Sequence, residues 1–455
     1  MSFSMDIEKL KQKILDLAIR GKLVPQDPND EPASVLIEKI KKEKNELIKQ
    51  GKIKPSKDDS YIYKGSDNCY YEKKGKITYN ISKEIPFDIP NSWIWTRLSV
   101  LTSKIQYGLN YPSKTSGKNK YLRITDIQNN QVNWECVPYV DITKDEEGFL
   151  LNNNDIVFAR TGATVGKSFL VINPPIGATF ASYLIRIVIN DFDIAQYLYS
   201  FFQSSFYWNQ IIDKAIGSTQ PNCNGTKLAS LLVPIPPLCE IKKINEKINI
   251  ILPKIENIIK LKKDTLSLVE SLKKAILNSF FDSENSTYKS YYENCLLQSH
   301  TKIIMGQSPK VVLNENIANS IEFHQGKLMF TKNEIDYSNK YTINPCKKTN
   351  GHSILLCVRA PVGILNYCNR KIAIGRGLCS IEPSTNVDLD YLYFWLLYLN
   401  KYFIDKSTGS TFSAITIGTI KNAPFKYCSL EIQHEIKTKI RELFNSLDII
   451  KEQII

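Results

Sequence analysis

The segment that most resembles a chemical motif runs from Gly162 to Ser168, where two glycines, a lysine and a serine suggest a phosphate cradle. A nucleotide-binding P-loop follows the pattern GxxxxGK[ST], and here the interval between the glycines is one residue short. The next residues, Phe169 to Ile172, predict a strand, whereas a P-loop needs the N-terminus of a helix there. We therefore expect no ATP binding at this segment.

A second segment, Asn173-Pro174-Pro175-Ile176, resembles the catalytic tetrapeptide of amino-group DNA methyltransferases. The last residue of that tetrapeptide should be aromatic, because its ring stacks on the flipped base. Ile176 has no ring, and no glycine-rich loop for a methyl donor follows a predicted strand. No Pro-Asp dipeptide begins a nuclease carboxylate motif. The sequence thus predicts a chain that performs no catalysis by itself.

Residues that bind metals are sparse. The chain has four histidines and ten cysteines, and neighbouring cysteines are at least 11 residues apart. The spacing excludes a paired-cysteine zinc knuckle, and scattered cysteines are typical of reduced thiols in a cytoplasmic protein. The polar N-terminus and the lack of 18 consecutive apolar residues predict neither a signal peptide nor a membrane span.

The net charge of +13 permits a polyanionic partner. Only nine of the 59 basic residues are arginines, and the excess of positive charge is spread along the chain. Because arginine is rare here, the retained arginines are the best candidates for bidentate contacts to phosphate or guanine.

The chain of 455 residues, long enough for two or three domains, repeats itself at a spacing of about 192 residues. Five matches occur in the same order in both copies. They are Gly108 with Pro112 and Gly306 with Pro309; Arg160 with Val165-Gly166 and Arg359 with Val362-Gly363; Tyr197-Leu198-Tyr199 and Tyr391-Leu392-Tyr393; Ile212-Asp213-Lys214 with Gly217-Ser218-Thr219 and Ile404-Asp405-Lys406 with Gly409-Ser410-Thr411; and the proline-containing ends Val233 to Leu238 and Pro424 to Leu430.

Each copy reads as an α/β unit of about 140 residues. Strands are predicted at Asp155–Ala159, Tyr183–Ile189, Ile354–Val358 and Leu378–Ile381. Single long helices are predicted at Ile194–Ile212 and Leu389–Ile404.

Amphipathic helices flank the copies. Isoleucine and leucine recur at heptad spacing from Glu240 to Phe281, and Pro253 should kink this helix or mark a late start. Similar spacing occurs from Ile7 to Leu17 near the N-terminus and again from Ile436 to Ile454 near the C-terminus. A further helix is predicted over Ala33–Gln50. The central helix would be about 60 Å long, so we expect the terminal helices to pair with it.

Over nearly its whole length the chain resembles the specificity subunit of type I restriction–modification enzymes. The resemblance rests on six segments: Ile14 to Pro25, Ile85-Pro86 through Trp93 to Leu98, Tyr121 to Ile127, Asp155 to Gly166, Gly306 to Pro309, and Ile374 to Leu378. The C-terminal helix departs from the pattern because it is shorter than the central helix.

The resemblance implies an α/β fold with two repeated target-recognition domains, separated by long antiparallel, coiled-coil-like helices in a pseudo-two-fold arrangement. The expected divisions are a helical region and linker at 1–84, recognition domains at 85–238 and 285–428, a central helix at 239–284 and a terminal helix at 429–455.

It also implies that each recognition domain reads one half of a split, asymmetric site in double-stranded DNA. The helices would dock two modification subunits, and restriction or translocase subunits would join them. S-adenosylmethionine, ATP and Mg²⁺ are expected in those subunits, with no cofactor in this chain.

Candidate DNA-binding residues are arginines in the two copies, a polar cluster near the end of the first copy, and neighbouring polar residues. For each arginine the alternative is an ion pair at the protein surface. The candidates are Lys120, Arg123, Arg160, Thr161, Lys167, Ser218, Thr219, Gln220, Asn222, Arg359, Arg370, Arg376, Ser410 and Thr411.

Two rival classes remain open: an orphan DNA-binding or anti-restriction protein without enzyme partners, and the recognition half of a fused restriction enzyme from another system. Co-purification with a methyltransferase subunit distinguishes the first rival, and gene neighbourhood distinguishes the second.

Overall fold

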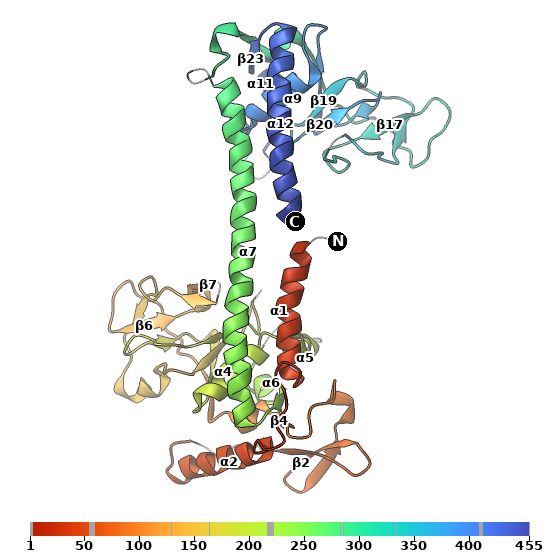
Figure 1. Ribbon diagram of the computed structural model, residues 1–455. Helices are drawn as coiled ribbons and strands as arrows, with labels where there is room; N and C mark the ends of the chain where they lie inside the picture. The colour runs from red at the N-terminus through yellow and green to blue at the C-terminus, as the bar shows by residue number, and fades with distance from the viewer. Residues whose placement is uncertain are drawn as a thin grey trace. The chain divides into compact units, whose positions relative to one another are not determined.

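A computed structural model describes residues 3–53, 60–128, 130–162, 164–215, 223–282, 284, 286–332, 334–408 and 413–454 (Figure 1). The chain divides into two compact units, residues 1–259 and 260–455, which are called the first and second unit below. Among the described residues no helix is long and apolar enough to cross a membrane.

The first unit is built on a four-stranded antiparallel sheet in the order β11-β10-β13-β5 and a three-stranded sheet in the order β12-β6-β9. Strand β12 runs parallel to β6. The strands are β1 (Tyr61–Lys64), β2 (Tyr70–Lys74), β3 (Ile77–Asn80), β4 (Ile94–Arg97), β5 (Lys104–Tyr107), β6 (Asn119–Leu122), β7 (Ile127–Gln128), β8 (Gln131–Val132), β9 (Tyr139–Val140), β10 (Ile156–Ala159), β11 (Ser168–Leu170), β12 (Thr179–Phe180), β13 (Leu184–Val188) and β14 (Leu232–Ile235).

Helices precede and cover these sheets. They are α1 (Phe3–Ile19), α2 (Ala33–Lys49), α3 (Leu98–Leu101), α4 (Phe192–Phe201), α5 (Ser205–Ala215), α6 (Gly225–Ala229) and the first half of α7 (Leu238–Phe281), with short 3-10 helices at Ser82–Glu84, Ile124–Asp126 and Lys144–Phe149. The second half of α7 belongs to the second unit.

The second unit repeats the pattern, with sheets in the orders β16-β22-β19-β20 and β18-β17-β21. Its strands are β15 (Glu293–Leu296), β16 (Thr301–Met305), β17 (Ile321–His324), β18 (Tyr341–Thr342), β19 (Ser353–Cys357), β20 (Leu365–Cys368), β21 (Ala373–Ile374), β22 (Leu378–Pro383) and β23 (Pro424–Tyr427). Its helices are α8 (Leu297–His300), α9 (Leu389–Tyr398), α10 (Asn400–Asp405), α11 (Ile417–Lys421) and α12 (Leu430–Ile454), with a 3-10 helix at Lys289–Tyr291.

Backbone hydrogen bonds confirm the repeat. Gly108 N donates to the carbonyl of Leu184, and Gly306 N donates to the carbonyl of Leu378 at the same place in the second unit. A Cβ on either glycine would overlap backbone carbonyl oxygens, so both positions require glycine. The helical tyrosines also correspond, because Tyr197 donates to the carbonyl of Pro234 in β14 and Tyr391 to that of Lys426 in β23.

The single long helices predicted from Ile194 and Leu389 are wrong, because each region forms two helices. In the first unit α4 ends at Phe201, and the hydroxyl of Ser204 accepts a hydrogen bond from Tyr207 N. Ser204 therefore caps the start of α5 and satisfies a backbone amide there, which stabilises the break.

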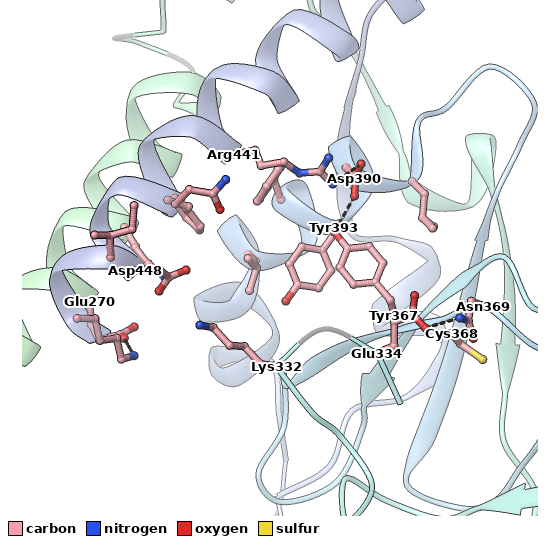
Figure 2. A pocket seen from close by; sticks show the side chains of 18 of the residues that line it. Glu270, Lys332, Glu334, Tyr367, Cys368, Asn369, Asp390, Tyr393, Arg441 and Asp448 are labelled. Carbon is pink, nitrogen blue, oxygen red and sulfur yellow. Dashed lines mark hydrogen bonds and ion pairs between the residues drawn. The ribbon is translucent and has the colours of Figure 1, made fainter. Parts of the chain in front are cut away.

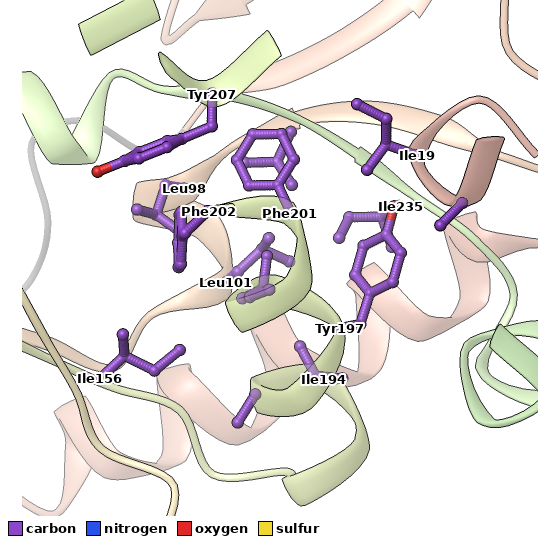
Figure 3. Close-up of a cluster of buried hydrophobic side chains, with 14 of the residues drawn as sticks. Ile19, Leu98, Leu101, Ile156, Ile194, Tyr197, Phe201, Phe202, Tyr207 and Ile235 are labelled. Atoms are coloured by element: carbon purple, nitrogen blue, oxygen red, sulfur yellow. The ribbon is translucent and has the colours of Figure 1, made fainter. Parts of the chain in front are cut away.

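Buried aromatic and aliphatic residues of α4 and α5 form the core of the first unit against the four-stranded sheet (Figure 3). Phe158 in β10 packs edge-on against Phe202, with ring centroids 4.8 Å apart. In the second unit Trp395 and Tyr391 of α9 occupy a comparable core with Phe281 at the end of α7. These cores hold the sheet ends in place.

The helices pair as predicted. In the first unit α1 packs antiparallel to the first half of α7, and Lys11 Nζ lies 2.7 Å from Glu256 Oε1. In the second unit α12 packs on the second half of α7, and Lys273 Nζ lies 2.7 Å from Asp448 Oδ1. Helix α7 is continuous through Pro253, so the late start that this proline suggested does not occur.

Candidate nucleic-acid interface

At one end of the four-stranded sheet of the first unit, three segments meet: residues 107–111, 159–162 and 181–184. We call them the first recognition edge. Leu109 N donates to the carbonyl of Phe180, and Ser182 N donates to that of Leu109. Arg160 N donates to the carbonyl of Tyr183. Backbone bonds thus fix the spacing of side chains that follow strands β5, β10 and β12.

Arg160 is the central cation of this edge. Its guanidinium carbon lies 5.0 Å from the centre of the Tyr107 ring. Its buried Nε has no hydrogen-bond partner, and no described carboxylate pairs with the side chain. An arginine held over a tyrosine, with no acceptor among the described residues, is available to contact a phosphate or a base edge.

Arg123 lines a cavity of about 420 Å³ together with Tyr111, Tyr121, Ser182 and Tyr183. Asp126 holds the arginine by hydrogen bonds from Nε at 3.1 Å and Nη2 at 2.8 Å. The hydrogen bond from Arg123 to Asp126 raises the pKa of the guanidinium. Asp126 therefore fixes Arg123 at the cavity wall. This geometry agrees both with a guanidinium positioned to donate hydrogen bonds to DNA and with the alternative of a surface ion pair.

Thr161 and Lys167 stand beside Arg160. Both are half-buried, and the main chain of Lys167 bonds to Ala159 and Thr164. Strand β11 follows directly at Ser168, as predicted, so the glycine-rich segment leads into a sheet rather than into the helix that a P-loop requires.

The second recognition edge consists of residues 305–308, 357–360 and 375–378. Val358 N donates to the carbonyl of Gly377. Arg359 and Arg376 each adjoin one of those residues, and both side chains are exposed, without a carboxylate partner among the described residues. The structure thus brings together two predicted arginines that are 17 positions apart in the sequence.

One sequence match within the repeat is wrong by one residue. Arg160 O accepts from Cys223 N, and the corresponding acceptor in the second unit is Val358 O, which accepts from Ile415 N. Arg359 therefore occupies the position of Thr161. Gly166 N donates to the carbonyl of Ala159, and Gly363 N donates to the equivalent carbonyl of Cys357. The two loops therefore correspond, and the loop that ends at Gly363 is one residue shorter.

Lys120 and Arg370 lie in networks within the three-stranded sheets. Lys120 Nζ donates to the carbonyls of Glu135 and Val137, and it lies 4.0 Å from the centre of the Tyr139 ring. These contacts occupy the amine within the protein. DNA contact by Lys120 stays a prediction, which its internal bonds do not favour.

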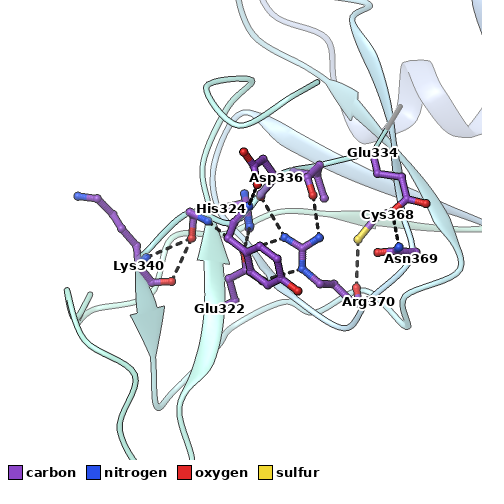
Figure 4. Close-up of polar contacts among 11 residues, drawn as sticks. Glu322, His324, Glu334, Asp336, Lys340, Cys368, Asn369 and Arg370 are labelled. Atoms are coloured by element: carbon purple, nitrogen blue, oxygen red, sulfur yellow. Dashed lines mark hydrogen bonds and ion pairs between the residues drawn. The ribbon is translucent and has the colours of Figure 1, made fainter. Parts of the chain in front are cut away.

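Arg370 is held more firmly (Figure 4). Its Nε and Nη2 donate to both carboxylate oxygens of Glu322 at 2.8 and 2.9 Å, and Nη1 donates to the carbonyl of Ile335. Hydrogen bonding to Glu322 raises the pKa of Arg370. The geometry favours the alternative of an ion pair for this arginine.

The remaining candidates, Ser218, Thr219, Gln220, Asn222, Ser410 and Thr411, lie outside the described residues. Their neighbours are described: Cys223 bonds to Arg160 of the first edge, and Ser413 O accepts from Ala360 N of the second.

Sequence reasoning missed the aromatic residues of the first edge. Tyr107, Tyr111 and Tyr183 are exposed there, although large aromatic side chains are usually buried. Tyr111 also donates to Glu146 Oε1 at 2.7 Å. The sequence predicts Tyr183 as the first residue of a strand, but β13 begins one residue later, at Leu184, and the ring of Tyr183 is exposed at the edge.

The second unit also contains a cavity of about 1170 Å³ beside α9 and α12 (Figure 2). Opposite charges pair around it, with Arg441 at 2.7 Å from Asp390 and Lys332 at 2.6 Å from Glu452. Tyr367 and Tyr393 stack at 4.4 Å on its wall. Because these charges neutralise one another, the described residues that line the cavity carry no excess of positive charge.

Comparisons with known proteins agree with the geometry. A family model described as "Type I restriction modification DNA specificity domain" matches residues 106–271 and 275–455. The chain is 33% identical over 289 residues to the type I restriction enzyme EcoAI specificity subunit of Escherichia coli, covering 60% of this chain and 45% of that protein. The chain thus spans less than half of that relative.

A match to the putative type I restriction enzyme MjaX specificity subunit of Methanocaldococcus jannaschii has 26% identity over 405 residues, covering 82% of this chain and 92% of that protein. A solved structure concerning complex assembly and conformational transition of the type I R-M system is similar in fold. Its TM-score is 0.65 at 23% identity, over 81% of this chain and 94% of that one.

Proposed function

The chain belongs to the family of type I restriction–modification DNA specificity proteins, and on that premise we propose that it selects the DNA sequence on which its complex acts. Each unit reads one half of a split, asymmetric site in double-stranded DNA. The chain itself carries out no methylation or cleavage.

The observation that carries this proposal is the pair of recognition edges. The same backbone hydrogen bonds fix Arg160 in one unit and Val358 in the other, where Arg359 follows Val358 and Arg376 precedes its partner Gly377. Phosphate contacts position a protein on DNA, whereas side chains at base edges in the major groove distinguish sequences. Two edges with the same backbone arrangement but different side chains suit two half-sites of different sequence.

The paired helices are proposed to dock two modification subunits, which restriction or translocase subunits join. Exposed apolar side chains on these helices support a protein partner, because such residues are usually buried. They are Ile250, Ile258, Leu268 and Leu272 on α7 and Leu443, Ile449 and Ile450 on α12. S-adenosylmethionine, ATP and Mg²⁺ would bind the partner subunits, and the complex would act in the cytoplasm.

Mapping of methylated adenines tests the proposal. A modification subunit from the source organism of this chain is expressed with and without the chain in a host that lacks other methyltransferases. We expect methylation of one split sequence only when both are present. A modification subunit that methylates the same sequence alone, or purified chain that methylates DNA by itself, would contradict the proposal. An orphan DNA-binding protein would bind DNA and leave methylation unchanged.

A further inference from the structure

A cavity of about 640 Å³ in the first unit lies between the end of α2 and strand β5 with helix α6. Its lining includes Lys44, Lys52, Lys104, Thr102 and Thr226, and none of the described residues that line it is acidic. We call this cavity the lysine groove. A concave surface with several cations and hydroxyl groups but no carboxylate has the chemistry to bind anions.

The three lysines of the groove differ in what holds them. Lys44 is buried, and its amine donates to the carbonyl of Ser99 at 2.8 Å, so it contributes charge from a fixed position. Lys52 and Lys104 are exposed. Among the described residues, the amine of Lys104 donates one long hydrogen bond, 3.4 Å to the carbonyl of Gly148. The amines of Lys52 and Lys104 can therefore reach a ligand in the groove.

Among the described residues, the lining of the groove supplies no carboxylate to balance its lysines. Burial, followed by the charge of Arg186, lowers the pKa of Lys104, and Asp155 opposes this shift. A bound anion would supply the missing negative charge and favour the protonated amine.

The groove is continuous with the first recognition edge. Tyr107 lines the groove, and its ring lies under the guanidinium of Arg160. The hydroxyl of Tyr107 accepts a hydrogen bond from Gly225 N at 2.9 Å, which fixes the ring between the two places. A polyanion that contacts Arg160 would thus have a second cationic surface next to it.

The second unit lacks this charge pattern. Lys302 occupies the position of Lys104 in the repeated sheet, but its Nζ lies 3.3 Å from Glu382 Oε2. The first unit has Val188 where the second has Glu382. Among the described residues, this lysine therefore has a carboxylate partner in the second unit and none in the first.

We propose that the lysine groove binds phosphate groups of the DNA backbone beside the half-site read by the first unit. The inference rests on the proposed function and adds a contact that is independent of sequence, because lysine binds phosphate as a point charge and does not read bases. Lys52 and Lys104 would each neutralise about one phosphate.

The salt dependence of DNA binding tests this proposal. The full chain, assembled with its modification subunits, is titrated with a duplex that contains its methylation site, between about 50 and 200 mM salt. The Lys52→Gln/Lys104→Gln variant should reduce the slope of log K against log [salt] by about 1.8, and weaken binding about 10-fold or more near 150 mM. Each single variant should give about half of the slope change.

Lys302→Gln is the matched control, because it removes the equivalent lysine where Glu382 already neutralises it; its slope should match the native complex. An unchanged slope in the double variant would overturn the phosphate assignment. So would a double variant that loses modification subunits while its slope stays native, since the groove would then bind an acidic protein surface.

Failure of the proposed function is visible separately, because the native complex would then show no preference for the methylated sequence over other DNA. The methylated sequence itself should be the same for the native chain and the double variant. A change of that sequence would show that the groove reads bases and would also overturn the proposal.

Discussion

The four-stranded sheets of the two units share their register but differ in what they bury. In the first unit Arg186 of β13 lies 3.2 Å from Asp155 Oδ2, and its guanidinium also donates to Gln106 and to the carbonyls of Gly148 and Leu150. Burial raises the pKa of Asp155 and lowers that of Arg186. Both directions mean that enclosing these charges costs free energy, which their mutual contact offsets only in part.

In the second unit the same positions hold Ser353 and Ser380, and Ile304 stands where the first unit has Gln106. The charged cluster of that unit lies instead in the three-stranded sheet. There Glu322 binds Arg370 and accepts from His324 Nε2 at 2.6 Å. Lys120, a residue of opposite charge, occupies the position of Glu322 in the first unit.

The comparison separates what the repeat preserves from what it allows to diverge. Main-chain hydrogen bonds and glycines at close approaches recur, because they depend on backbone geometry alone. The buried polar clusters lie in different sheets in the two units, because a fold tolerates any arrangement in which buried polar groups have hydrogen-bond partners. A frame of this kind permits the two recognition edges to differ without loss of the fold.

The largest effect is expected from Arg186→Met. The substitution leaves Asp155 buried without its cation, so the free energy of unfolding of the first unit should fall by about 3–5 kcal/mol. Urea unfolding measures the loss, and hydrogen exchange of β10 and β13 assigns it to the first unit.

Adding Asp155→Asn to Arg186→Met should restore more than about half of that loss, because replacing a whole buried pair is far cheaper than breaking it. The second unit already folds with serines at these positions. A double variant as unstable as the single one would show that the pair is not what distinguishes the two sheets.

A smaller loss of stability, equal in the two units, is expected when the glycines that both units share are replaced. Gly108→Ala and Gly306→Ala each place a Cβ against carbonyl oxygens, so each should destabilise its own unit by about 1–3 kcal/mol. Gly148→Ala is the control, since the nearest atom to its Cβ, Lys104 Nζ, is 3.8 Å away. Thermal unfolding checks all three, and a loss at only one of the two equivalent glycines would contradict the common frame.

The smallest effect is a loss of stability of the second unit between pH 7 and 5.5, caused by His324. Burial lowers the pKa of His324 below 6.5, although Glu322 opposes the shift. As pH falls through 6.5 the unfolded chain binds a proton before the folded chain does, so stability is lost. Burial would raise the pKa of Glu322, but hydrogen bonds from Arg370 and His324 outweigh it and lower the pKa below 4.5, which adds a further loss at lower pH.

Asp155 has the opposite sign, because its raised pKa lets the folded chain bind a proton first. Because the lowered pKa of His324 causes the loss of stability, hydrogen-exchange protection factors for the amide of Phe323 should fall between pH 7 and 5.5. His324→Gln, which keeps a donor to Glu322 but does not titrate in this range, should remove that fall. Equal falls in the native chain and the variant would assign the dependence to other groups.

Much of the fold could be predicted from the sequence. Heptad spacing and apolar strands are visible in short segments, and the internal repeat is visible when the chain is compared with itself. The paired helices and the strands at Ile156 and Ile354 are confirmed. The break at Ser204 was missed because a capping hydroxyl inside an apolar stretch resembles an ordinary helical residue.

The edges could be predicted only in part. The rarity of arginine pointed to Arg160, Arg359 and Arg376, which the fold places at the edges. It pointed equally to Arg370, because the sequence does not reveal that Glu322, 48 positions away, lies within hydrogen-bond distance. The exposed tyrosines and the lysine groove depend on tertiary packing that composition does not encode.

The central claim is that each unit reads its own half of the DNA site. Residues 100–235 are exchanged for the corresponding residues of another family member, and the methylated sequence is mapped in a complex with the native modification subunits. The account predicts that one half of the methylated sequence changes to that of the donor, while the other half stays the same. Simultaneous change of both halves would contradict it.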